Sequence, residues 1–269
     1  MQLKMIKALW GMEGSLEAQF ERIHKAGYKG VESPLPAPEH AKRFQELLDE
    51  YQLDYIAMVF SNADNHAGSF ERSVEQAAQF KPILINSHSA KDSMPWKEQV
   101  DYFTKAIAIE QQIGLPIGHE THRGRAMFTP WGTAELLKEL PDLRVTADFS
   151  HWCCVCESLL EDQAANLAVV MERVIHIHGR IGYAQGPQVP HPAAPEYAQE
   201  LQVHEGWWRQ IAQQHRAKGH SQITFTPEFG PPGYMHTLPF TNQPVADLWD
   251  VCLWMANHMS KRQEEWFSN

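Results

Sequence analysis

Four acidic or imidazole side chains stand at the ends of four successive apolar segments from residue 116 onward: Glu120, Asp148, His178 and Glu228. Each follows apolar or small residues, as expected for a side chain at the end of a buried strand. Three carboxylates and one imidazole form a hard, oxygen-rich donor set that suits Mn²⁺, Mg²⁺, Co²⁺ or Fe²⁺, and Zn²⁺ is also compatible. The pattern predicts one divalent-metal site built by these four residues.

Each of these residues, taken singly, could have a structural role instead of binding a metal. One carboxylate at a strand end is as often a helix N-cap or part of an ion pair as a metal ligand. Three carboxylates brought together without a cation, however, would be strongly destabilising or would become protonated. The group as a whole therefore favours a bound cation.

Side chains this far apart in sequence meet only if their strands end at a common edge. Strand-like apolar segments alternate with helices of period 3.6 along the chain, which is typical of a parallel sheet with crossover helices. We expect eight strands, at residues 4–9, 30–33, 55–60, 82–86, 116–120, 144–148, 174–178 and 223–226. The sequence thus predicts a single domain over residues 1–269, an α/β fold of the (β/α)₈ TIM barrel type, in which the strand ends share one pocket.

The predicted helices carry apolar stripes that would pack on the sheet. These stripes are Ala41, Phe44, Leu47, Leu48 and Tyr51, then Val100, Phe103 and Ile107, and finally Val245, Leu248, Val251, Cys252 and Met255. Gly27, Gly114 and Gly219 stand where helices should end, as C-cap glycines do. An open doubly wound sheet would instead show a Gly-rich phosphate loop after the first strand, and residues 10–13 offer none. Two Pro/Gly-rich loops, at residues 182–195 and 227–233, would flank the pocket.

Composition excludes several classes of protein. The formal charge of −10 makes a nucleic-acid partner unlikely, because such a surface repels phosphate backbones. No apolar run is long enough to span a membrane, and residues 1–14 look like a first strand instead of a signal peptide. Three of the four cysteines are crowded at residues 153–156, which is unsuited to a disulfide framework and indicates a reducing, cytoplasmic location.

The strand-end motifs together resemble a known family. Gly118-His119-Glu120, Asp-Phe-Ser-His at 148–151, Val-Ile-His-Ile-His at 174–178 and Thr-Pro-Glu-Phe-Gly at 226–230 are similar to the xylose-isomerase-like TIM barrels. This group contains sugar isomerases, ketose 3-epimerases, inosose dehydratases and apurinic-site endonucleases. Each motif is weak alone, but their order and spacing are fairly specific. The resemblance covers nearly the whole chain and is strongest from residue 118 onward.

The resemblance implies a metal-assisted proton transfer. Glu120, Asp148, His178 and Glu228 would bind one divalent ion, with His178 and not His176 as the imidazole ligand. In the family's epimerases the two glutamates are also the acid/base pair, here Glu120 and Glu228. An ion that binds a carbonyl and its neighbouring hydroxyl acidifies the C–H bond between them, and a carboxylate moves the proton. No organic cofactor is required.

Further side chains at strand ends are predicted to contact the substrate. The family pattern gives this role to His151, while Arg123 and Arg180 lie just beyond ligand strands and could bind hydroxyls, a carboxylate or a phosphate. An ion pair at the surface or rim is the alternative for both arginines. Glu32, His88 and Trp10 complete the predicted substrate contacts. Trp152 is a further candidate for stacking on a sugar. The alternative for Glu32 is a structural role, and the alternative for Trp10 and Trp152 is packing in the core.

The chain departs from the family pattern at several positions. The epimerases have an arginine six residues beyond the metal histidine, where this chain has Ala184, and the usual acid after that histidine is absent. Apurinic-site endonucleases hold three zinc ions with additional histidines, and a second metal here would use residues such as His88, His122, His151 and His191. Against it, Asn62 replaces the strand-three histidine, and the acid–x–histidine pair of the strand-seven loop is missing.

The leading hypothesis is a metal-dependent isomerase or epimerase of a sugar or related polyhydroxylated carbonyl compound. A lyase or dehydratase of the same substrate class shares the first proton abstraction and is the main alternative. Phosphodiester cleavage in damaged DNA is disfavoured by the charge, and a protein without turnover is disfavoured by the intact metal-binding set. The partner is then a small carbohydrate-like molecule, and a homo-oligomer is compatible with the sequence.

Overall fold

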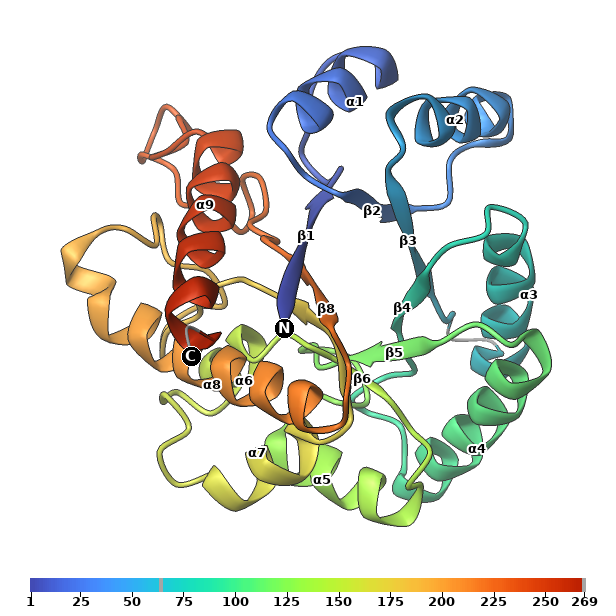
Figure 1. The fold of residues 1–269 in the computed structure, drawn as a ribbon. Coiled ribbons are helices and arrows are strands. Elements are labelled where there is room, and N and C mark those ends of the chain that lie inside the picture. The colour runs from blue at the N-terminus through green and yellow to red at the C-terminus, as the bar shows by residue number, and fades with distance from the viewer. Residues whose placement is uncertain (63–64, 268–269) are drawn as a thin grey trace.

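The computed structural model describes residues 1–62 and 65–267 and shows a closed barrel of eight parallel strands, ordered β1 to β8 as in the sequence (Figure 1). The strands are β1 Gln2–Ala8, β2 Gly30–Pro34, β3 Asp54–Phe60, β4 Leu84–His88, β5 Ile117–Glu120, β6 Val145–Ala147, β7 Val174–His178 and β8 Gln222–Thr226. Pairing of β1 with β8 closes the ring. The predicted (β/α)₈ TIM barrel is therefore confirmed.

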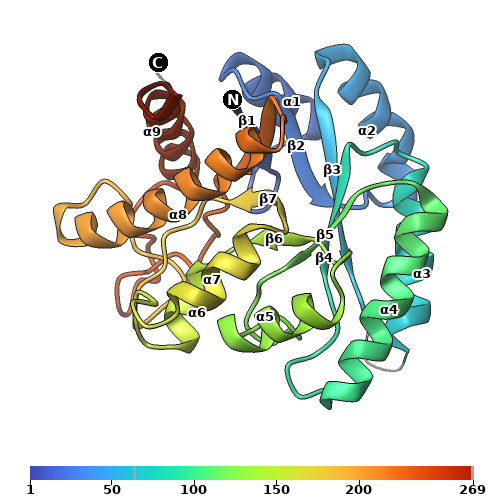
Figure 2. The same cartoon turned by 60° about the horizontal axis from the view of Figure 1, so that its bottom comes forward.

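Helices surround the ring of strands, as both views show (Figures 1 and 2). They are α1 Leu16–Lys25, α2 Pro38–Tyr51, α3 His66–Ala78, α4 Trp96–Ile113, α5 Pro130–Glu139, α6 Ser150–Val155, α7 Ala164–Met171, α8 Ala198–Ala217 and α9 Leu248–Phe267, with a short 3₁₀ helix η1 at Pro195–Tyr197. No helix in the described part of the chain has the length and apolar character needed to cross a membrane.

The predicted helical stripes match the buried faces with two corrections. In α4 only Phe103 of the predicted stripe is buried, while Tyr102 and Ala106 complete the buried face. The predicted stripe omits Tyr102 because its hydroxyl is polar. In the structure its ring is nevertheless buried and packs on Phe70, at 5.9 Å between centroids. Val245 was assigned to the last helix, but it precedes α9 and is 43% exposed.

The predicted helix ends agree with the structure, and the predicted bounds of the fourth strand do not. Gly27, Gly114 and Gly219 have φ angles of +86°, +73° and +85°, which confirms them as helix-terminating glycines. The fourth strand was expected at residues 82–86 but runs from Leu84 to His88, so His88 is its last residue.

The inside of the barrel changes from apolar to polar along its axis. Ile6, Ile56 and Leu84 form a small buried cluster separate from the main core between strands and helices. Further toward the carboxyl ends, most of the buried inward-facing residues are polar: Glu32, Asn86, Glu120, Thr146, Asp148, His176, His178, Thr224 and Thr226. Because buried polar groups need partners, this layer must form a connected network or bind a ligand.

The loop after β7 is held against the carboxyl end of the barrel. Gln188 donates from Nε2 to the Gly230 carbonyl at 3.2 Å and accepts from the Gly230 N–H at 2.7 Å, which ties the two predicted Pro/Gly-rich loops together. A Cβ on Gly182 would lie 2.4 Å from the Ser150 carbonyl oxygen and 2.6 Å from its Cα. This loop therefore needs glycine in order to approach α6.

We predict that Gly182→Ala destabilises the protein, because the new methyl group would meet backbone atoms of Ser150 that cannot rotate away. The expected loss in free energy of unfolding is about 1–3 kcal/mol. Gly206→Ala in α8 is the matched control: a Cβ there meets nothing within 4 Å, and it should stabilise the helix by about 0.5–1 kcal/mol. Urea unfolding followed by tryptophan fluorescence measures both, and equal midpoints for the two variants would contradict the prediction.

Candidate metal centre

The four predicted metal ligands meet at the carboxyl end of the barrel. Glu120 ends β5, Asp148 directly follows β6, His178 ends β7, and Glu228 lies two residues beyond β8. One ligand atom from each lies within 4.8 Å of the corresponding atoms of the others, and all four residues are buried. The structure thus brings together side chains from four separate strands in the manner that the sequence predicts.

Several atoms of this group lack the hydrogen bonds that buried polar atoms normally make. Glu120 Oε1 has no hydrogen-bond partner among residues 1–62 and 65–267. His178 Nδ1 also has no well-oriented hydrogen bond, although it lies 3.0 Å from Glu228 Oε2 and 3.6 Å from Glu120 Oε2. Buried polar atoms left without a hydrogen bond, within a group of ligand atoms this close together, fit a divalent cation.

The charges at the centre also fit a cation. Glu32, Glu120, Asp148 and Glu228 carry four formal negative charges, and the buried Arg180 contributes one positive charge, which leaves −3 when the histidines are counted as neutral. Burying this excess charge without a counterion is unfavourable. A divalent ion would neutralise most of it.

The pKa values of the centre show the same excess of negative charge. Burial by itself lowers the pKa of His178, but the carboxylates of Glu228, Glu32 and Glu120 outweigh burial and raise this pKa well above the ordinary value. For Asp148, burial is opposed by Arg180 and reinforced by Glu120, and its pKa rises to about 6. Burial also raises the pKa of Glu32, yet His178 and His176 outweigh it and lower that pKa, so Glu32 is ionised.

Arg180 forms a buried ion pair and not the surface pair that the sequence offered as an alternative. It is 1% exposed and bonds to Asp148 Oδ2. Its Nε donates to Ser150 Oγ at 3.1 Å, and its Nη2 lies 3.5 Å from Glu228 Oε2. The guanidinium carbon lies 4.7 Å from the ring centroid of Tyr234. Arg180 therefore fixes one of the predicted ligands while it faces the cavity.

A cavity of about 490 Å³ opens above the four ligands. Its lining residues are Ala8, Leu9, Trp10, Glu32, Ser33, Pro34, Met58, Phe60, His88, Glu120, His122, Arg180, Glu228 and Tyr234. Strands β1 to β3 supply mainly apolar side chains, while the segments after β4 supply the titratable ones. Four predicted substrate contacts, Glu32, His88, Trp10 and Arg180, are thus placed at the cavity wall.

Two other predicted substrate contacts lie next to residues that line the cavity. His151 is 0% exposed, and its Nε2 lies 2.8 Å from Arg180 Nη2. Arg123 stacks over Tyr234, with 5.2 Å from its guanidinium carbon to the ring centroid. Neither is among the described residues that line the cavity. Trp152 is wrong as a stacking candidate, because it is fully buried and stacks on Phe149.

The additional histidines divide into two groups. His88 and His122 lie with Glu120 in a second set of three residues whose ligand atoms are within 4.8 Å of one another. His151 packs on His122, at 3.9 Å between ring centroids. His191, in contrast, packs on Trp254 of α9. It is not among the described residues that line the cavity.

Three further cavity residues, Met58, Phe60 and Tyr234, could not be singled out from the sequence. Tyr234 lies in the loop after β8, where no strand period fixes its direction. Phe60 ends β3 and Met58 lies two residues earlier, so both face the same side of that strand. The strand-end position of Phe60 was the one available signal, and it was passed over because the residue carries no polar group.

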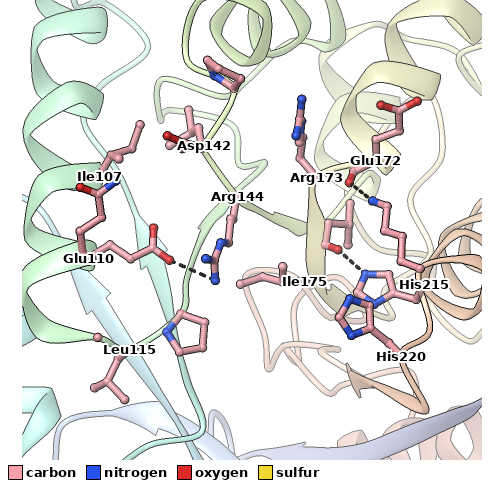
Figure 3. A pocket seen from close by; sticks show the side chains of 17 residues that line it. Ile107, Glu110, Leu115, Asp142, Arg144, Glu172, Arg173, Ile175, His215 and His220 are labelled. Atoms are coloured by element: carbon pink, nitrogen blue, oxygen red, sulfur yellow. Dashed lines mark hydrogen bonds and ion pairs between the residues drawn. The ribbon is translucent and has the colours of Figure 1, made fainter.

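A second cavity, of about 610 Å³, lies away from the predicted chemistry (Figure 3). It is lined by residues that precede β5, β6 and β7, and so it lies at the amino end of the barrel. Its charged groups are partly used within the protein: Arg144 pairs with Glu110 at 3.4 Å, and Lys218 donates to the Glu172 carbonyl at 2.6 Å. Active sites of TIM barrels lie at the opposite, carboxyl end. The smaller cavity is therefore the candidate site.

Three solved structures of similar fold align with this chain over nearly the whole length of both proteins. The probable 3-DHS dehydratase of petrobactin synthesis from Bacillus anthracis shares 17% identity over 97% of this chain and 100% of that chain, with a TM-score of 0.63. The 3-keto-D-glucoside 4-epimerase from E. coli shares 12% identity, with 97% and 100% coverage and a TM-score of 0.65. A xylose isomerase-like TIM barrel protein from Mycobacterium smegmatis, solved in complex with magnesium, shares 10% identity, with 98% and 97% coverage and a TM-score of 0.65.

Identities this low establish the fold alone. A search of curated protein sequences finds no match to this chain. The sequence profile of one family, described as xylose isomerase-like TIM barrel, matches residues 20–230, which is well over half of the chain. By this match, and in agreement with the resemblance that its motifs showed, the chain belongs to the xylose isomerase-like TIM barrel family.

Proposed function

We propose that this chain is a divalent-metal-dependent isomerase or epimerase of a sugar or related polyhydroxylated carbonyl compound. The observation that carries the proposal is the buried group of Glu120, Asp148, His178 and Glu228 beneath an open cavity. Among proteins of similar fold, one is named a 3-keto-D-glucoside 4-epimerase and another was solved with magnesium, which supports the proposal.

The protein's own residues are arranged for proton transfer beside a bound carbonyl compound. A divalent ion at this centre would polarise the carbonyl and acidify the neighbouring C–H bond. Asn86 Nδ2 donates to Glu120 Oε2 at 2.8 Å, and His88 Nε2 lies 2.8 Å from the same oxygen. Glu120 Oε1 is left without a hydrogen bond within the described part of the chain, so it is available to hold a proton.

The second carboxylate of the acid/base pair is Glu228. It comes from β8, whereas Glu120 comes from β5, and both line the cavity. A substrate between them would meet one carboxylate from each side, as the exchange of a proton at one carbon requires. Asp148 has no part in this exchange in our proposal; it is paired with Arg180 and accepts from Ser150 Oγ.

A dehydratase or lyase of the same substrate class is the second candidate. One solved structure of similar fold is named a probable 3-DHS dehydratase, and its reaction class would use the same type of proton abstraction. Cleavage of damaged DNA is not supported by the cavity, because its lining contains one arginine and no lysine among the residues that the structure describes. Phosphate backbones are bound mainly by such cations.

The metal proposal predicts that the wild-type protein takes up one divalent ion per chain and is stabilised by it. At an Mn²⁺ concentration 100 times the dissociation constant, the gain in free energy of unfolding should be about 2.7 kcal/mol. Asp148→Asn should lose most of this stabilisation, because it removes a charged ligand. Glu205→Gln is the control, since Glu205 is also a buried carboxylate, but it pairs with Arg262 outside the barrel. Thermal unfolding with Mn²⁺ and with a chelator measures the effect, and identical gains in wild type and Asp148→Asn would contradict it.

The acid/base assignment predicts that Glu228→Gln lowers turnover by at least about 10²-fold, because an amide cannot accept or return the proton. The fold should persist, as judged by circular dichroism and the melting temperature, since the amide has the same shape. Glu205→Gln should retain wild-type turnover. Activity of Glu228→Gln close to wild type would remove Glu228 from the reaction.

The two candidate reactions differ in the fate of solvent deuterium. In heavy water, an isomerase or epimerase should introduce deuterium at carbon without loss of a group from the substrate. A dehydratase should release water after the same proton abstraction. Mass spectrometry of a panel of ketoses, inososes and 3-keto-glycosides distinguishes the two reactions. If neither reaction is seen and the protein instead nicks a DNA duplex with an abasic site, both candidates would be replaced by a nuclease.

A further inference from the structure

Glu32 reaches from the middle of β2 across the inside of the barrel to both histidines of β7. Its Oε1 accepts a hydrogen bond from His178 Nε2 at 2.9 Å. Its Oε2 accepts from His176 Nε2 at 3.1 Å and from Thr226 Oγ1 at 2.6 Å. All four side chains are at most 1% exposed. Both oxygens of Glu32 are therefore used inside the protein.

These contacts decide which ring nitrogen of His178 faces the four-ligand centre. An ionised carboxylate can only accept hydrogen bonds, so the contact with Glu32 keeps a proton on His178 Nε2. The other nitrogen, Nδ1, then points to Glu228 and Glu120, at 3.0 and 3.6 Å. A histidine binds a metal through an unprotonated nitrogen, and a carboxylate on its other N–H fixes the ring and increases its basicity.

We propose that Glu32 is a positioning residue, which holds His178 with Nδ1 directed at the metal and Nε2 protonated. This inference rests on the metal centre of the proposed function and assigns Glu32 a role other than substrate contact.

The second histidine of β7 has a place in the same arrangement. His176 Nδ1 lies 2.7 Å from Thr224 Oγ1, so a hydroxyl of β8 can donate to it while His176 Nε2 donates to Glu32. Thr226 holds the same carboxylate oxygen. Glu32 is thus fixed from β7 and β8 independently of His178, and the support for the metal ligand is preorganised.

The burial of Glu32 argues against the two other roles that its position permits. A substrate hydroxyl would have to displace one of three existing donors in order to reach a carboxylate oxygen. Glu32, His176 and His178 also have ligand atoms within 4.8 Å of one another, but a metal there would require removal of the protons that now form their hydrogen bonds. The observed contacts favour a support for the neighbouring centre.

The first test is independent of any metal. In ¹⁵N-labelled protein, the Nε2 proton of His178 should exchange slowly with solvent and give a direct ¹H–¹⁵N correlation. Glu32→Ala should lose this signal, while Thr224→Val, which removes only the contact to His176, should retain it. Persistence of the His178 signal in Glu32→Ala would overturn the proposal.

The second test is the affinity for Mn²⁺, measured by competition with a chelator at fixed pH. Glu32→Ala should bind about 10–100-fold more weakly than wild type, the usual effect of losing such a supporting carboxylate. Glu32→Gln preserves the volume of the side chain and guards against misfolding; it should also bind more weakly, because its amide is a poorer acceptor. Thr224→Val should bind nearly as tightly as wild type.

The outcomes separate this inference from the proposed function. If wild type binds no Mn²⁺, the metal centre and the role of Glu32 both fail. If wild type and both Glu32 variants bind equally well, the metal centre stands and only the positioning role is overturned. An increase in KM for substrate with unchanged Mn²⁺ affinity would likewise overturn it and assign Glu32 to substrate binding.

Discussion

The arrangement of this molecule depends on a concentration of negative charge that is buried at one end of a closed barrel. Three of its carboxylates lie at or just beyond the carboxyl ends of β5, β6 and β8, a fourth lies within β2, and the buried Arg180 stands among them. Such a group is unfavourable in a low-dielectric interior unless a cation accompanies it. His178 Nδ1, which lies 3.0 Å from Glu228 Oε2 and 3.6 Å from Glu120 Oε2, is an atom that such a cation could bind.

Closure of the sheet makes this convergence possible. In an open sheet the strands that carry Glu120 and Glu32 would lie apart, whereas a ring allows contact across its interior. The apolar cluster of Ile6, Ile56 and Leu84 fills the barrel below, so the polar layer rests on a packed base. The site is therefore built on rigid strands, and the loops after β7 and β8 supply Arg180, Glu228 and Tyr234.

Polar and apolar groups are separated around the cavity in a way that suits one bound molecule. The titratable side chains come mostly from segments after β4, and the apolar wall comes from β1 to β3, with Trp10 and Phe60 each 36% exposed. A ligand would place its polar atoms toward the metal centre and an apolar face toward β1 to β3. This agrees with a sugar-like compound, whose ring faces pack on aromatic side chains.

The amino-acid sequence by itself determined the number and order of the strands and the four candidate ligands, because hydrophobic periodicity and strand-end position are local properties. It could not determine that Arg180 pairs with Asp148, that Glu32 contacts His178, or that His151 lies next to Arg180. Those contacts join residues from different strands and depend on side-chain direction and on the curvature of the closed ring. Only the tertiary structure decides them, since no local pattern records which side chains meet across a barrel.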